Sequence, residues 1–72
     1  MREPDRRMIE RLKGAFPPGT EVILEHMDDI QAPPEGTRGK VIAVDDCATI
    51  HVAWDTGSTL GITYGKDRCR RV

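Results

Sequence analysis

The sequence predicts a small, mainly β domain: a five-stranded SH3-like barrel preceded by a short α-helix. Three observations predict this class. Short segments alternate between apolar and polar residues, Gly and Pro residues separate these segments, and 72 residues accommodate only a small core. The clearest segment places Ile50, Val52 and Trp54 on one face of a strand, and a turn centred on Gly57 follows. Because Gly adopts a positive φ at little cost, this segment is typical of a β-hairpin.

The N-terminal segment is predicted to form an amphipathic helix over residues 4–15. Its apolar residues recur at helical spacing, and they are Met8, Ile9, Leu12 and Phe16. The pair Pro17-Pro18 ends the helix, because proline has no N–H to continue the hydrogen-bond ladder. We therefore divide the chain into a helix at 1–16 and a barrel at 17–72. The helix is expected either to cap the open end of the barrel or to dock on a second copy, as a homodimer.

The rest of the chain is predicted to form five short strands. They cover residues 20–27, 38–44, 49–54, 60–63 and 68–72. The connection between the first two contains Pro33 and Pro34, which cannot donate to a sheet ladder, and is therefore a loop. This loop has roughly ten residues, and loops of that length in so small a domain are often functional.

Charge is distributed unevenly along the chain. The net charge is −1, but the two ends are basic and the middle is acidic. Because an acidic surface repels phosphate, nucleic-acid binding would have to use the ends. The sequence contains no apolar stretch of about 20 residues and no signal-peptide core, so we expect a cytoplasmic protein without a membrane partner. Cys47 and Cys69 lack metal-ligand spacing and are expected to be free thiols in a reducing compartment.

Five motifs occur in order along nearly the whole chain. They are Phe16-Pro17-Pro18-Gly19-Thr20, Met27-Asp28-Asp29, Ala32-Pro33-Pro34-Glu35-Gly36-Thr37-Arg38-Gly39, Val44-Asp45-Asp46 and Trp54-Asp55-Thr56-Gly57-Ser58-Thr59-Leu60-Gly61. This pattern resembles the family of small bacterial and phage proteins called domain of unknown function 4314. The resemblance implies a bacterial, phage or mobile-element origin, and it brings no known activity. The chain departs from the family at Cys47-Ala48, where members commonly have an apolar residue followed by Gly.

A second, weaker likeness concerns part of the barrel. Gly36, Gly39, Val41 and the run from Trp54 to Ser58 are similar to the Mind-bomb/Herc2-type SH3-like module. That module binds protein segments, so the likeness implies protein recognition.

The leading functional hypothesis is a small, non-enzymatic protein-interaction module. Its expected binding residues lie in the long loop, the next turn and the link before the last strand, and they are Asp28, Asp29, Pro33, Pro34, Asp45, Asp46 and Tyr64. The paired aspartates could form an acidic rim that recognises Lys or Arg of a partner. The alternative is that each Asp only starts a turn by accepting a bond from its own backbone.

The second hypothesis is a nucleic-acid-associated protein that uses the basic ends. Its candidate residues are Arg6, Arg7, Arg68, Arg70 and Arg71. The alternative is a solvated helix face and a solvated tail. The spacing of His26 and His51 matches no familiar metal-ligand set, and we expect no metal, no cofactor and no catalytic residues. Trp54 is expected in the core, with a stacking platform as its alternative, and Gly61 marks a bulge or a close backbone approach.

Overall fold

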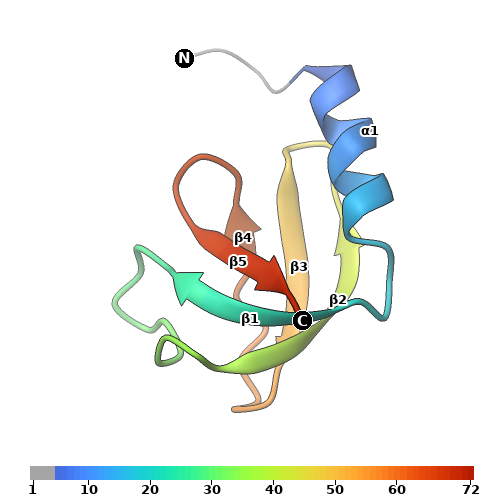
Figure 1. The fold of residues 1–72 in the computed structure, drawn as a ribbon. Coiled ribbons are helices and arrows are strands. Elements are labelled where there is room, and N and C mark those ends of the chain that lie inside the picture. The colour runs from blue at the N-terminus through green and yellow to red at the C-terminus, as the bar shows by residue number, and fades with distance from the viewer. Residues whose placement is uncertain (1–4) are drawn as a thin grey trace.

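The computed structural model describes residues 5–72, which form one helix followed by five antiparallel strands (Figure 1). The elements are α1 (Arg6–Ala15), β1 (Glu21–His26), β2 (Arg38–Val44), β3 (Thr49–Trp54), β4 (Ile62–Thr63) and β5 (Arg68–Arg71). This order confirms the predicted sequence of elements. Residue 4, where the helix was predicted to begin, lies outside the described residues.

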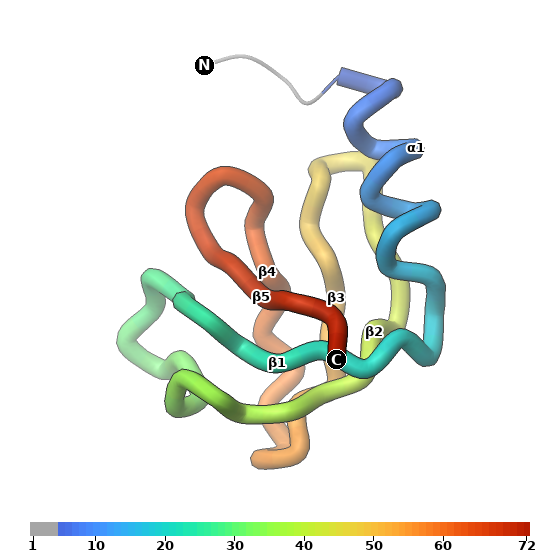
Figure 2. Tube along the Cα trace, viewed as in Figure 1, coloured from blue at the N-terminus to red at the C-terminus, as the bar shows by residue number. Residues whose placement is uncertain are grey.

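The strands form a single open sheet in the order β4-β3-β2-β1-β5. All four pairings are antiparallel. β4 and β5 are the two edges of the sheet and form no ladder with each other, although the sheet curves enough to bring them into contact (Figure 2). The mainly β class is therefore confirmed. The sequence predicted a five-stranded SH3-like barrel, and the five strands form one curved sheet whose edges β4 and β5 do not pair.

The core lies on the concave side of this sheet and centres on the predicted hairpin. Trp54 is only 3% exposed, and its indole Nε1 donates a hydrogen bond to the carbonyl oxygen of Leu60 at 2.8 Å. The ring packs directly over Gly39, where an added Cβ would lie 2.8 Å from Trp54 Cε3 and 2.6 Å from Val52 Cγ1. The core placement predicted for Trp54 is thus confirmed, and Gly39 is the residue that makes room for it.

Gly61 makes the close approach that the sequence predicted. A Cβ at this position would lie 2.6 Å from Cγ2 of Thr49, on the neighbouring strand β3. Ala48, in the β2–β3 turn, adopts a φ of 59°. This left-handed conformation favours Gly, so Ala48 adopts a backbone geometry that residues with a Cβ rarely take.

Helix α1 packs against the sheet of its own chain. Asp5 caps its N-terminus by accepting a hydrogen bond from the N–H of Arg7 at 2.9 Å. Ile9 and Leu12 are buried within the same apolar cluster as the strands. Lys13 Nζ lies 3.3 Å from Oδ1 of Asp46 and ties the helix to the β2–β3 turn. Of the two expected helix contacts, packing on its own sheet is therefore observed.

Candidate binding groove

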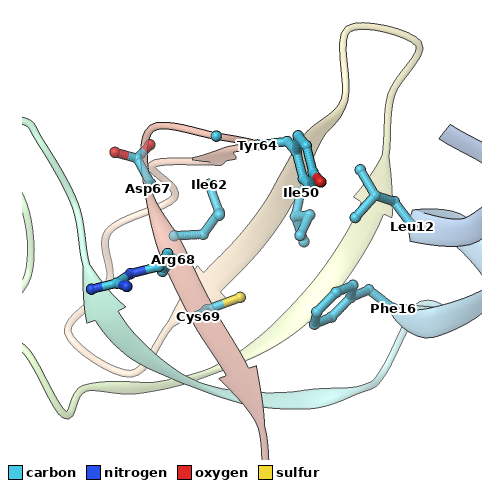
Figure 3. A pocket seen from close by; sticks show the side chains of 9 residues that line it. Leu12, Phe16, Ile50, Ile62, Tyr64, Asp67, Arg68 and Cys69 are labelled. Carbon is cyan, nitrogen blue, oxygen red and sulfur yellow. The ribbon is translucent and has the colours of Figure 1, made fainter. Parts of the chain in front are cut away.

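An open groove of about 370 Å³ lies between helix α1 and the two edge strands (Figure 3). We call it the edge groove. Its lining residues are Leu12, Phe16, Ile50, Ile62, Tyr64, Gly65, Asp67, Arg68 and Cys69. Most of this lining is apolar. Leu12, Ile50 and Ile62 belong to the buried core, whereas Phe16 and Cys69 are partly buried against it.

A buried carboxylate fixes the turn at one end of the edge groove. Asp67 is 8% exposed, and its Oδ1 accepts from the backbone N–H of Asp28 at 2.9 Å. Its Oδ2 accepts from the backbone N–H of Thr63 at 3.0 Å. The side chain therefore joins the long β1–β2 loop to the β4–β5 turn. Because both oxygens are satisfied, this carboxylate stabilises the turn and is not a free acid facing the groove.

Tyr64 is the exposed aromatic residue of this turn. It is 55% exposed, and its backbone N–H donates to the carbonyl oxygen of Ala48 at 3.2 Å. Figure 3 shows its ring at the lip of the groove, across from Phe16. Among the residues predicted for protein binding, Tyr64 alone lines the edge groove, and Arg68 from the nucleic-acid hypothesis lines it as well.

Cys69 contributes a half-buried thiol to the wall formed by β5. Burial raises its pKa to about 11, and the nearby charge of Glu25 acts in the same direction. The thiol therefore stays protonated at neutral pH and forms part of the apolar surface. Cys47 is exposed in the β2–β3 turn, and both cysteines are free.

The edge groove has a basic border on the β5 side. Arg68 is one of its lining residues, and Figure 3 shows its guanidinium directed outward from the groove. Arg71 Nη1 lies 3.4 Å from the carbonyl oxygen of Ala15, at the C-terminal end of α1. Lys66 is exposed in the preceding turn.

The four aspartates predicted to form an acidic rim lie in two separate places. Asp28 and Asp29 belong to the long loop, whereas Asp45 and Asp46 lie beside the helix, on the other side of the molecule in Figure 1. Asp29 Oδ1 accepts from the N–H of Gln31 at 2.7 Å, as an Asp that starts a turn does. The structure thus does not bring these carboxylates together along one groove.

Asp45 also stabilises the turn in which it lies. Its Oδ1 accepts from the backbone N–H groups of Cys47 at 2.9 Å and Thr49 at 3.0 Å. Its Oδ2 lies 2.8 Å from Nε2 of His51. The bond with His51, followed by the bond from Thr49, holds the pKa of Asp45 below its usual value. His51, predicted as a solvated surface residue, is therefore half-exposed and engaged with Asp45.

The two prolines of the long loop differ in exposure. Pro33 is buried, whereas Pro34 is exposed. The carbonyl oxygen of Pro34 accepts from the backbone N–H of Thr37 at 3.1 Å and from its hydroxyl at 2.6 Å. Of this pair, only Pro34 has a side chain available to a partner.

The predicted basic ends meet at one point. Arg71 contacts Ala15 at the C-terminal end of α1, but Arg6 and Arg7 occupy the opposite end of that helix. Arg70 Nε lies 4.0 Å from Oε2 of Glu25 on the neighbouring strand. The arginines are thus spread along the molecule instead of forming one patch.

Most of the residues that line the edge groove were not predicted from the sequence as binding residues. Leu12 and Phe16 were assigned to helix packing, and Cys69 and Asp67 were assigned no role. The groove depends on how the two edge strands β4 and β5, near the end of the chain, meet helix α1 near its beginning, and no local pattern predicts that arrangement. A partial signal was available in the turn that carries Tyr64, because Asp67 is the acidic residue in an otherwise basic tail.

Residues 5–72 contain neither a metal-binding cluster nor a membrane-spanning helix. No group of three or more His, Cys, Asp or Glu side chains there is placed to hold a metal ion. Helix α1, the helix of that range, is neither long enough nor apolar enough to cross a membrane.

Fold and geometry define a small, mainly β domain that combines an open five-stranded antiparallel sheet, one helix and an apolar groove at the sheet edges. The family model of the Domain of unknown function (DUF4314) matches residues 5–72. The chain therefore belongs to this family, as its motifs predicted. No curated protein and no solved structure matches the chain significantly.

Proposed function

We propose that this chain is a small, non-enzymatic protein-interaction module that binds a partner through the edge groove. The observation that carries the proposal is the groove itself, in which the exposed ring of Tyr64 and the partly buried Phe16 and Cys69 lie together beside the core. Exposed apolar surface bordered by polar residues is typical of protein-binding sites, and tyrosine is common among residues that dominate binding energy. The sheet order, with β5 paired to β1 and a short turn after β4, supports an SH3-like class.

The proposal includes a setting for the protein. Its resemblance to small bacterial and phage proteins supports a bacterial, phage or mobile-element origin and a cytoplasmic location. The absence of a catalytic role is part of the same proposal. It is supported by two lining residues: both oxygens of Asp67 accept from backbone N–H groups, and burial keeps the thiol of Cys69 protonated.

Site-specific photo-crosslinking tests this function. A benzoylphenylalanine would replace Tyr64, and the same amino acid at Ile30, which is fully exposed in the long loop, would serve as the control. After nuclease treatment of a bacterial lysate, we expect protein adducts at position 64 that are absent at position 30. Equal adducts at both positions, or no protein adducts at position 64, would contradict the proposal.

The acidic-loop hypothesis concerns a different surface of the same module. Asp28 has an exposed side chain in the long loop, and its backbone N–H is held by Asp67. If this loop recognises a basic partner, the double change of Asp28→Lys and Asp29→Lys should weaken binding of that partner. Unchanged affinity would assign recognition to another surface.

A second candidate function is nucleic-acid association. One observation favours it: Arg71 of β5 contacts the C-terminal end of α1, so part of the two basic ends lies together. Binding of this kind would weaken log-linearly with salt concentration, because phosphate contacts release counterions. Affinity for an oligonucleotide that does not change with salt would reject it.

A further inference from the structure

We propose that the edge groove binds an extended acidic segment of a partner protein, which adds as a strand to β5 and places an apolar side chain between Phe16 and Tyr64. This inference rests on the proposed function and specifies the partner of the same groove. Three properties of the groove carry it: the backbone edge of β5, the apolar lining and the basic border.

The first property is an available strand edge. The backbone N–H of Val72 donates to the carbonyl oxygen of Glu21 at 3.0 Å, and Arg70 stands opposite Ile23 in the ladder. Because bonding alternates along an antiparallel strand, the backbone groups of Cys69 and Arg71 face away from β1. Within residues 5–72 no strand pairs with that side of β5. An extended peptide can complete such an edge with main-chain hydrogen bonds.

The second property is the apolar lining beside this edge. Leu12 and Phe16 face β5 across the groove, with Ile50 behind them (Figure 3). Side chains of an added strand alternate between the two faces of the sheet. One of them would therefore point toward Ile50, between the rings of Phe16 and Tyr64. An apolar side chain fits this place, because a polar one would lose water without gaining a hydrogen-bond partner.

The third property is the charge along β5. Arg68, Arg71 and the neighbouring Lys66 border the groove, while its one acidic lining residue, Asp67, has both oxygens bonded to backbone N–H groups. A segment that carries Asp or Glu on either side of its apolar residue would complement this border. A second copy of the chain fits poorly, because pairing β5 with β5 would bring the same arginines together. A nucleic acid would leave the apolar floor of the groove without a matching surface.

Selection from a random library of displayed peptides tests the partner chemistry, with the full chain as bait. We expect enriched peptides to carry an aromatic or aliphatic residue flanked by Asp or Glu. Replacing the flanking acids with Lys, or the central apolar residue with Ser, should weaken binding about tenfold or more in fluorescence polarisation. N-methylation of the peptide backbone beside the apolar residue should do the same, because it removes the main-chain donor.

Variants of the chain locate the binding. Tyr64→Ala and Arg71→Glu should each lower the affinity for the enriched peptide about tenfold. Both variants should keep the wild-type circular dichroism spectrum. Arg38→Glu is the matched control, because it makes the same charge change on an exposed position of β2, away from the groove residues. Its affinity should stay within about twofold of wild type, since distant rim charges contribute little.

Failure of this inference can be told apart from failure of the proposed function. Enrichment of Lys-rich or Arg-rich peptides, no enrichment at all, or peptide binding that Tyr64→Ala leaves unchanged would each overturn the acidic-segment proposal. Tighter binding of a single-stranded oligonucleotide than of the enriched peptide would also overturn it. Protein adducts at position 64 would still support the proposed function, whereas their absence would reject both.

Discussion

The part of the sheet formed by β2 and β3 and the part that contains the edge strands β4 and β5 differ in how closely their side chains pack. In the first half, Trp54 lies over Gly39 with no room for even one more carbon atom. In the second half, two edge strands approach without pairing, and a buried Asp67 joins their turn to the long loop. The first arrangement buries Val41, Val52 and Trp54 tightly, and the second leaves an apolar groove. The comparison teaches that one side of this domain is built for stability while the other keeps surface available for a partner.

The largest expected effect breaks the tightly packed half. Gly39→Ala places a methyl group 2.6 Å from Val52 Cγ1 and 2.9 Å from the carbonyl oxygen of Ala53, and backbone cannot move aside cheaply. We expect the free energy of unfolding to fall by about 3 kcal/mol, as measured by urea denaturation. Gly14→Ala is the control, because a Cβ in α1 would meet nothing within 4 Å. It should gain about 0.5–1 kcal/mol, and equal effects of the two changes would contradict the packing account.

The next largest effect concerns the two hydrogen bonds that Asp67 accepts from the backbone beside the edge groove. Asp67→Asn replaces one acceptor oxygen with an NH₂ group, which cannot accept from the N–H of Asp28 or Thr63. A buried donor left without a partner costs about 2 kcal/mol, and we expect a loss of this size in thermal or urea unfolding. Hydrogen exchange at these two amides should accelerate. Asp29→Asn, at an exposed site, is the control and should change stability far less.

A smaller effect depends on pH and on Asp45. The bond with His51 lowers the pKa of this carboxyl in the folded protein, so the ionised form is favoured more strongly there than in the unfolded chain. Its contribution is therefore present above the unfolded pKa of about 4 and is lost as the pH falls below it. Asp45→Asn should lower the free energy of unfolding at neutral pH, and the difference from wild type should shrink on acidification. A difference that is constant with pH would show that the charge of Asp45 does not contribute.

The smallest change is chemical and leaves the fold intact. Cys69 has a pKa of about 11 and is half-buried in the groove, whereas Cys47 is exposed. Because the thiolate is the reactive form, iodoacetamide at neutral pH should modify Cys47 well before Cys69. Peptide mapping by mass spectrometry measures the order. Faster modification of Cys69 would mean that the open half is less well packed than the structure shows.

The sequence predicted those parts of the fold that local patterns determine. The hairpin around Gly57 follows from alternation and turn chemistry, and the burial of Trp54 follows from its place on the apolar face. The helix is equally local, since its apolar spacing and the Pro17-Pro18 pair lie in one segment. The relation between the two edge strands is not local, and the prediction of an SH3-like barrel did not specify that β4 and β5 leave the sheet open.

The candidate site was predicted less well, for two physical reasons. Aspartates favour turns and binding surfaces alike, and Asp29 and Asp45 turned out to bond their own turns. The groove also combines residues that stand more than 50 positions apart, such as Leu12 and Cys69, and only the folded chain brings them together. Tyr64 was predicted from its place in the short link before the last strand, where SH3-like domains often carry an aromatic ligand contact. Its role in binding stays a prediction.

A titration of the isotope-labelled chain with the library-enriched peptide, followed by amide NMR shifts, tests the central claim most directly. The account predicts that the largest shifts cluster at Leu12, Phe16, Tyr64, Cys69 and Arg71, around the edge groove. Shifts that cluster instead in the long loop at 28–37, or at Arg6 and Arg7, would contradict it and assign binding to the acidic loop or to the basic end of the helix.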